Sequence, residues 1–298
     1  MRRTTFAALA VCAVVCETNA ASAQATGPTA SVSYERSTIG LEKPQSRDTK
    51  DSIGIQTLRF RAAYPIPLGE RTILVPGLSY DLLHFPETTS KGLPTDTLHA
   101  PMVNVSLIQL LGSRVMIGGE IRSGLSSDFQ ERISSDDLAL TVAAMGTYKF
   151  ADNFSLGAYL GYNRQSRTFF PAVALNWDIR ERFRIRGWIP ASTHVEFRAT
   201  PWLTVGIREA LDFDVFHLSG RKYGEGGTQF SYMTINVGPQ ATVSFSDTTH
   251  LDIFASASVM RRYEWMVDGD SKRDGYLPSV ITFGARLWFG SAGWRGEP

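Results

Sequence analysis

Cysteine is almost absent from this sequence of 298 residues. The two cysteines, Cys12 and Cys16, lie within one apolar segment near the N-terminus. The remaining chain can therefore form neither a disulfide framework nor a thiolate metal site. None of the five histidines lies at metal-ligand spacing from another. We therefore predict a protein without a bound metal or other cofactor.

Long apolar runs are missing after the first 25 residues, where no segment reaches the roughly 18–20 apolar residues of a transmembrane helix. Residues 1–25 combine a basic start, MRR, an apolar stretch, FAALAVCAVVC, and the small residues ASAQA. This order is typical of a secretory signal peptide, with cleavage after Ala23 or Ala25. We expect residues 1–25 to be this signal peptide and residues 26–298 to form one exported domain.

An excess of either charge is also missing. Removing residues 1–25 takes away Arg2, Arg3 and Glu17, which leaves basic and acidic residues in equal number. Such a chain gives no reason to expect nucleic acid as a partner. The sequence also has no phosphate-binding glycine loop with lysine, no HExxH and no GxSxG. We therefore predict that the protein is not an enzyme.

What the sequence does have is alternation with a period of two. Apolar residues alternate with polar or small residues over 138–150, 154–162, 233–245 and 281–289. Alternation of this length predicts β-strands, and no segment after residue 25 has long helical periodicity. We predict about 14 strands, or 12 if the first strand or the short pair around 188–197 does not form. The strands are expected to begin near residues 29, 52, 71, 98, 113, 137, 154, 169, 182, 192, 202, 228, 249 and 277.

The connections between these segments alternate in length through most of the chain. Tight turns, as near 113 and 152, alternate with longer polar segments such as 126–136 and 218–228. A membrane β-barrel has this asymmetry, and it carries aromatic residues near the strand ends, as this sequence does. We therefore favour an all-β, transmembrane, antiparallel up-and-down β-barrel. The alternative is a soluble β-sandwich, whose two sheets would enclose the apolar faces.

The segment ITFGARLWFG at 281–290 has an apolar face that ends in Phe289. With the signal peptide, the cysteine-free remainder and the alternating segments, it resembles the closing strand of a Gram-negative outer-membrane β-barrel, porin-like in kind. A second resemblance is to uncharacterised outer-membrane barrels of about this length. In those barrels a strand that ends in proline leads into a hairpin, as in WIPASTHVEFRATPWL at 188–203.

These resemblances imply a location in the cell outer membrane, in contact with its lipid. They also imply recognition by periplasmic chaperones and the barrel-assembly machinery, through an assembly strand with Phe283, Leu287 and Phe289. Such barrels typically end in a C-terminal Phe or Trp, whereas here GSAGWRGEP follows Phe289. The resemblances imply no defined substrate.

Charged residues fall on the polar face of three successive predicted strands. If that face lines the lumen, these charges form a mixed lattice in the barrel wall. Such a lattice can select solutes by size and charge, or it can neutralise itself and keep a narrow lumen closed. The candidate site residues are Arg182, Arg184, Arg186, His194, Glu196, Arg198, Arg208, Asp212 and Asp214.

The function that we predict is a passive outer-membrane channel for small solutes with a charged lumen. The alternative from another class is a non-conducting barrel that serves as a structural protein or surface receptor. A third interpretation is an outer-membrane lipid hydrolase, whose Ser–His pair would come from distant strands.

Overall fold

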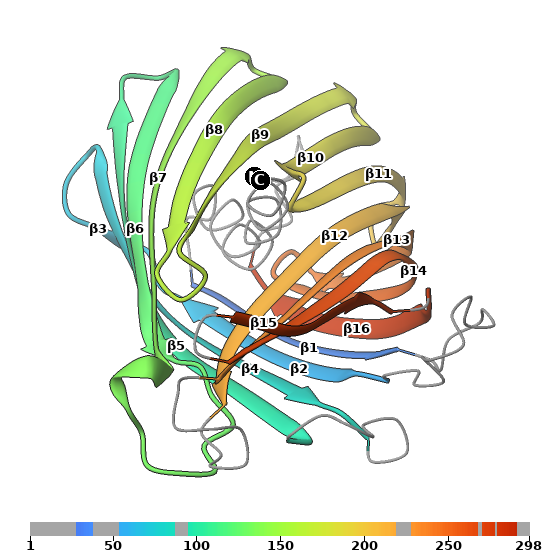
Figure 1. The fold of residues 1–298 in the computed structure, drawn as a ribbon. Coiled ribbons are helices and arrows are strands. Elements are labelled where there is room, and N and C mark those ends of the chain that lie inside the picture. The colour runs from blue at the N-terminus through green and yellow to red at the C-terminus, as the bar shows by residue number, and fades with distance from the viewer. Residues whose placement is uncertain are drawn as a thin grey trace.

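The computed structural model describes residues 28–37, 54–86, 95–218, 228–267, 270–277 and 279–290. The predicted signal peptide, most of the long connections and the residues after Gly290 lie outside these ranges. The described residues contain no α-helix, and the one short 3-10 helix among them is not long enough to cross a membrane. The segments with period two form one antiparallel sheet that closes on itself (Figure 1).

Fourteen strands make up the barrel wall, as predicted, and the 12-strand alternative is wrong because both of the less certain strand groups are present. Two short strands, β3 (Ile66–Pro67) and β15 (Asp270–Tyr276), extend the edges of β4 and β14, and a 3-10 helix, η2 (Ser135–Asp137), precedes β7. The wall strands are β1 (Thr29–Ser37), β2 (Gln56–Ala63), β4 (Thr72–His84), β5 (Thr97–Leu111), β6 (Val115–Leu125), β7 (Leu138–Ala151), β8 (Phe154–Asn163), β9 (Thr168–Arg180), β10 (Phe183–Ile189), β11 (Ser192–Thr200), β12 (Leu203–Leu218), β13 (Thr228–Ser246), β14 (Thr249–Val267) and β16 (Ile281–Phe289).

The barrel closes through the first and last wall strands. Each of the other wall strands pairs with its neighbours in chain order, and β1 pairs with β16 over a register that runs from Ala30 opposite Phe289 to Ser37 opposite Thr282. β16 pairs with β14 on its other side. Closure leaves no free sheet edge around most of the wall, which a lipid environment demands because it offers backbone groups no hydrogen bonds.

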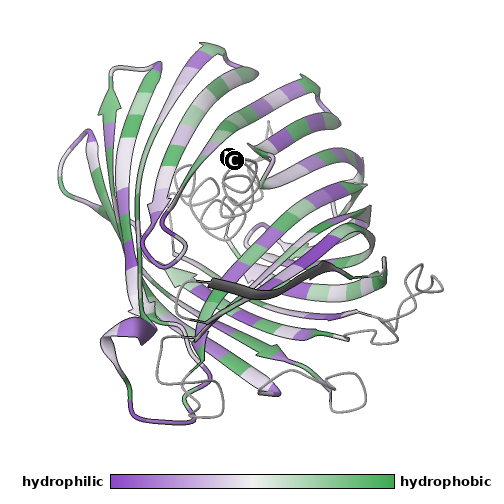
Figure 2. Ribbon diagram, in the orientation of Figure 1, coloured by the Kyte–Doolittle hydropathy of each residue, from purple (hydrophilic) through white to green (hydrophobic). Residues whose placement is uncertain are grey.

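Along most of the wall the apolar face of the strands points outward, as the barrel prediction requires. On β7, Val142 is 44% exposed whereas the neighbouring Thr141 is buried. On β16, Phe283, Leu287 and Phe289 are exposed on the outside. The residues between them point inward, and two nitrogens of one of them, Arg286, lie 2.9 and 2.7 Å from Asp252. Figure 2 shows hydrophobic and hydrophilic residues alternating along most of the wall strands.

The two ends of the barrel differ. Strand pairs such as β5–β6 and β7–β8 are joined by tight turns at what we call the turn end, where Gly112 adopts a φ of 79°. The connections 38–53, 87–94, 126–137 and 219–227 leave from the opposite end, the loop end. Of these, only 126–137 lies within the described residues. The predicted asymmetry of the connections is therefore present in the fold.

The hairpin of β10 and β11 is much shorter than the strands beside it. β10 has 7 residues and β11 has 9, against 13 in β9 and 16 in β12. The ladder with β9 ends where Ile189 pairs with Val173, and the ladder with β12 ends where Ser192 pairs with Ala210. Towards the loop end, β9 and β12 therefore run on without a partner between them. We call this gap the wall split.

Beyond the wall split, β12 turns into the barrel. Its His217 forms a parallel bridge with Ser127, which in turn forms an antiparallel bridge with His99 of β5. Residues 126–127 thus lie between β12 and β5. Both faces of the loop-end half of β12 (211–218) are covered, since Leu211 on one face and Phe216 on the other are each 1% exposed.

The inward turn corrects one expectation for β13. Period two predicts that Ile235 faces lipid like Val237, and Val237 is indeed exposed. Ile235, however, is partly buried, and Met233 on the same face is buried. Alternation assigns a residue to one side of the sheet, but it does not reveal that this side becomes covered where the sheet bends inward.

Candidate functional site: a divided lumen

The loop-end half of β12 divides the barrel interior, and an apolar cluster fills the space on one side of it. Side chains of β12 and β13 pack here against those of β4, β5 and the residue that precedes β2. This inner cluster consists of Ile55, Leu83, Phe85, Leu98, Ala100, Phe216, Leu218, Phe230 and Tyr232. Because these residues lie near the loop end, the cluster obstructs the barrel mouth on that side.

A second apolar cluster lies on the opposite face of β12. The inner faces of β7, β8 and β9 meet the face of β12 and β13 that would otherwise contact lipid. This split cluster consists of Ala143, Met145, Tyr159, Phe170, Ala172, Trp188, Ala191, Leu211 and Met233. The Tyr159 ring stacks on Phe170 and meets Trp188 edge-on, with ring centroids 5.8 and 5.6 Å apart.

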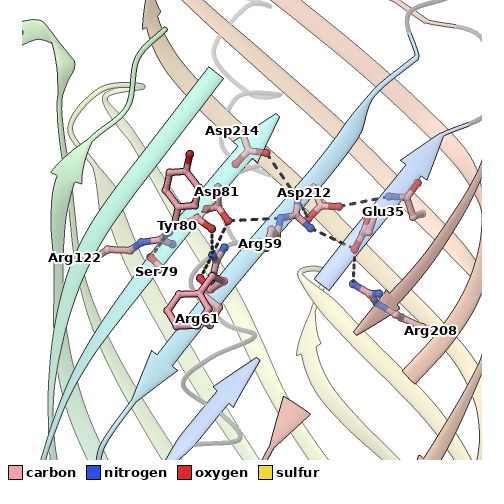
Figure 3. A network of polar contacts seen from close by, with 12 residues as sticks. Glu35, Arg59, Arg61, Ser79, Tyr80, Asp81, Arg122, Arg208, Asp212 and Asp214 are labelled. Atoms are coloured by element: carbon pink, nitrogen blue, oxygen red, sulfur yellow. Dashed lines mark hydrogen bonds and ion pairs between the residues drawn. The ribbon is translucent and has the colours of Figure 1, made fainter. Parts of the chain in front are cut away.

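On the same face of β12 as the inner cluster, charged side chains join this strand to strands on the other side of the lumen (Figure 3). Arg59 of β2 lies 2.8 Å from Asp212 and 3.9 Å from Asp214, both on β12. A different guanidinium nitrogen of Arg59, Nη1, lies 3.5 Å from Glu35 of β1. Arg208 of β12 lies 3.8 Å from Glu35. The ion pairs therefore span the lumen and do not merely run along one wall.

Asp81 of β4 extends this network along the wall. It pairs with Arg61, and it lies 3.9 Å from Arg59 and 3.4 Å from Arg122. Arg122 also donates a 3.1 Å hydrogen bond to the Ser79 hydroxyl. We call the set the cross-lumen network; its members are Glu35, Arg59, Arg61, Asp81, Arg122, Arg208, Asp212 and Asp214.

The predicted charged residues on β10 and β11 form a separate group. Glu196 accepts hydrogen bonds from Arg184 and from Arg186, whose Nη2 lies 3.1 Å away. Arg184 and Glu196 face each other across adjacent strands, as do Arg186 and His194. These ion pairs therefore join the adjacent strands β10 and β11 and do not cross the lumen.

The hairpin of β10 and β11 requires glycine at position 187. Its φ is 140°, and a Cβ there would collide with the Ser192 carbonyl.

The structure thus divides the nine predicted site residues into two groups and two residues that stand apart from them. Arg208, Asp212 and Asp214 belong to the cross-lumen network, and Arg184, Arg186, His194 and Glu196 lie on the inner face of the short hairpin. Arg198 lies near the turn end, where it donates to the Pro201 carbonyl at 3.4 Å. Arg182 is exposed in the turn between β9 and β10, so it does not line the lumen as predicted.

Sequence reasoning missed the other half of the cross-lumen network. Arg59 and Arg61 alternate with Leu58 and Phe60 in the stretch LRFR, which is the same signal that singled out β10. The sequence could therefore have placed these arginines on the inner face. It could not have shown that this face lies opposite Asp212.

Two small cavities lie between β12 and the wall. One of about 50 Å³ lies towards β4–β8, and another of about 30 Å³ lies towards β1, β2 and β16. Asp214 lines both. Each is large enough for a few water molecules, and between them the described side chains of β12 and β2 are in contact across the lumen.

A local Ser–His contact bears on the hydrolase interpretation. Ser192 Oγ lies 3.2 Å from His194 Nε2, on one strand and not on distant strands. Glu196, two positions further along the same face, is held by Arg184 and Arg186. The geometry provides a nucleophile and a base in contact, without a carboxylate dedicated to orienting the imidazole. Among the described residues, no group of three or more His, Cys, Asp or Glu side chains could hold a metal ion.

Several solved structures share the barrel architecture. The COG4313 outer membrane channel from Pseudomonas putida F1 matches with a TM-score of 0.42 and 11% identity, over 89% of this chain and 95% of that one. The Pseudomonas putida toluene transporter TodX matches with a TM-score of 0.43 and 11% identity, over 96% of both chains. LpxR from Salmonella typhimurium matches with a TM-score of 0.36 and 8% identity, over 88% of this chain and 99% of that one. At such identities we carry no activity over from them.

Comparison with the curated proteins gives no match. The family model described as "Domain of unknown function (DUF6268)" matches residues 73–268, which include β4 to β14, the wall split and the loop-end half of β12. Since the match covers well over half of the chain, this β-barrel protein belongs to the DUF6268 family.

Proposed function

We propose that the protein is an outer-membrane channel for small solutes, and that the loop-end half of β12 shuts it in the conformation described. The observation that carries the proposal is the contact across the lumen between Arg59 of β2 and Asp212 of β12. The apolar outer face supports the location, because a barrel with exposed Val142, Phe283 and Phe289 would be poorly soluble in water.

The chemistry of the closure favours a gate over a permanent plug. Buried ion pairs are often no more stabilising than apolar side chains of similar volume, because removing both charges from water is costly. A permanently filled barrel would gain from an apolar core throughout. Charged groups that become hydrated again when β12 moves suit an element that opens, and they would then line the passage as the predicted charged lumen.

A second candidate is the non-conducting barrel with a structural or receptor role. The two apolar clusters favour it, because Leu211 and Phe216 pack on opposite faces of β12 and hold that strand in place. In this case the cross-lumen network stabilises the closed barrel permanently.

Conductance across planar bilayers separates the two candidates. The double variant Arg59→Gln/Asp212→Asn removes the pair that joins β2 to β12, and the channel proposal expects step openings to become more frequent than in the unmodified protein. A matched control, Arg286→Gln/Asp252→Asn, removes a pair between adjacent wall strands and should not open the lumen. A correctly folded barrel that never conducts, with either pair removed, would support the structural role.

A further inference from the structure

The backbone at the wall split is arranged so that the two strands beside it do not pair. On β9, the Asp178 N–H donates to the Asn153 carbonyl on the side of β8. Backbone groups of successive residues point to opposite sides of a strand, so Pro171 directs its nitrogen to the side of β10. β10 has already ended there, since Ile189 pairs with Val173. Proline has no N–H, so it leaves no donor unpaired at this edge.

The edge of β12 on the other side of the split is satisfied from within the barrel. The Leu211 N–H donates to the Ala191 carbonyl at the end of the short hairpin, at 2.9 Å. Further along, Ser126 Oγ donates to the Val215 carbonyl at 2.6 Å, and the His217 N–H donates to the Ser126 carbonyl at 2.9 Å. The split can therefore persist in a membrane without the two strands closing on each other.

Outside the split lies an apolar groove on the face that we assign to lipid. The groove has a volume of about 580 Å³, and its sides include Leu160, Val173 and Ile189, which are all exposed. Small residues on β7 and β8, among them Ala144 and Ala158, form its floor. It reaches β9 at Pro171, the position at which the split begins. The groove is therefore continuous with the lipid-facing surface and adjoins the split.

Inside the split lies the split cluster, whose polar side-chain groups are the Tyr159 hydroxyl and the Trp188 indole nitrogen. Trp188 is 4% exposed, and its indole Nε1–H has no hydrogen-bond partner among the described residues. A buried indole donor usually finds an acceptor, because leaving it unpaired costs free energy. Methionine side chains such as Met145 and Met233 adapt readily to different shapes. The cluster thus combines adaptable apolar walls with the Trp188 donor, which has no acceptor in the part of the chain that the structure describes.

We infer that the wall split is a lateral access site, through which a neutral lipophilic molecule passes from the bilayer into the split cluster. The hydrocarbon part would lie among Met145, Phe170 and Leu211, and one oxygen acceptor, such as an ester carbonyl, would accept the Trp188 Nε1–H. The inference rests on the proposed outer-membrane location and names a class of solute, but it does not require the axial lumen to conduct ions.

Bromine quenching of tryptophan fluorescence tests the inference on the full-length protein. The protein is reconstituted in phosphatidylcholine vesicles, and dibrominated methyl stearate is titrated in, with unbrominated ester as the blank. We expect a saturable component of quenching that disappears in Trp188→Phe. This component should remain in Trp202→Phe, which removes a tryptophan that is exposed outside the split.

A second variant shows whether the bromine atoms quench Trp188 from inside the split cluster or from the lipid outside the wall. Ala172 lies in the split cluster, and Ala172→Phe should fill the space and abolish the saturable component. Ala257→Phe, on the exposed face of β14, adds the same side chain elsewhere and should leave the component unchanged. Heat-dependent mobility in gels confirms that each variant is a folded barrel.

The outcomes separate this inference from the proposed function. A protein that does not insert into vesicles as a barrel contradicts the proposed location. A folded, inserted barrel overturns the lateral site if quenching of Trp188 never saturates or is the same in Ala172→Phe. Saturable quenching in a barrel that never conducts ions would leave the lateral site standing and remove only the axial channel.

Discussion

At the scale of single residues, Arg59 holds more of the closed interior together than any residue that the sequence singled out. It lies within 3.9 Å of four carboxylates, on β1, β4 and β12. With so many partners, its guanidinium compensates the desolvation of groups on both sides of the lumen. Removing one member of a buried pair is more damaging than removing both, because the remaining charge is left without compensation.

We predict that Arg59→Gln lowers the free energy of unfolding by about 3–5 kcal/mol. The reason is that Asp212 would keep its charge in a closed interior without its main partner. The measurement is urea unfolding of the reconstituted barrel. The control is Lys149→Ala, which removes an exposed pair with Asp152 at the turn end and should cost less than about 1 kcal/mol. Similar losses for both variants would contradict a closed lumen.

A second residue-scale prediction concerns the lipid face. Val142→Arg should cost about 2–4 kcal/mol if Val142 lies near the bilayer midplane, since its side chain points outward from β7, four residues in from the end of the strand. Phe245→Arg, at the turn end of β13, should cost only about 0–1 kcal/mol, because the arginine can reach the interface. The two values come from the same unfolding measurement. Equal costs at the two positions would speak against a membrane-spanning orientation.

At the scale of elements, the connection 126–137 fastens β12 in its inward position. Ser126 bonds to β12 twice, and His217 Nδ1 lies 2.8 Å from Asp137 Oδ1. Burial alone would raise the pKa of Asp137. Hydrogen bonds from the Ser127 side chain, the Ser134 N–H and His217 outweigh it and lower this pKa below its usual value. The connection therefore depends on an ionised carboxylate.

We predict that this fastening weakens in acid. A carboxyl group with a lowered pKa stabilises the folded form above its usual pKa of about 4, and this contribution is lost as pH falls through the lower folded value. The protection of amides in residues 126–137 against hydrogen exchange, measured relative to an unstructured peptide at the same pH, should therefore fall below about pH 4. In Asp137→Asn this protection should be low already at neutral pH and change little on acidification. Protection that does not depend on pH in the unmodified protein would contradict this.

At the scale of the whole molecule, the difference between the two ends of the closed barrel bears on its orientation in a membrane. Long connections at one end and tight turns at the other are the usual arrangement of outer-membrane barrels, with the longer loops outside the cell. We therefore expect the connection 126–137 to face outside and the turn after β7 to face the periplasm. In this orientation the wall split would open in the half of the wall towards the outside.

We predict that a single cysteine in place of Ile133 is labelled by a membrane-impermeant maleimide on intact cells. Ile133 is exposed in the connection at the loop end, and the chain beyond residue 25 contains no other cysteine. A cysteine in place of Asp152, at the turn end, should be labelled only after the outer membrane is permeabilised. The reverse pattern would invert the proposed orientation.

The sequence alone determined most of the wall strands and which of their residues share a face, and it limited the number of strands to 14 or 12. Period two is a local property, because each strand needs apolar residues at alternate positions whatever its partner is. It therefore placed Val142 and Phe289 outside, and Arg184, Glu196 and Asp212 inside, before any partner was known. Turn lengths are local as well, and for this reason the difference between the two ends could also be predicted.

Only the tertiary structure decided what the inner faces do. The inward turn of β12, the pairing of Arg59 with Asp212 and the wall split all depend on contacts between strands that are distant in the sequence. Pro171 illustrates the limit: the sequence places it within a strand, but only the structure shows that the ladder between β9 and β10 ends at Ile189 and Val173, just before Pro171 is reached. A local pattern records which way a side chain points, and the fold decides what lies there to meet it.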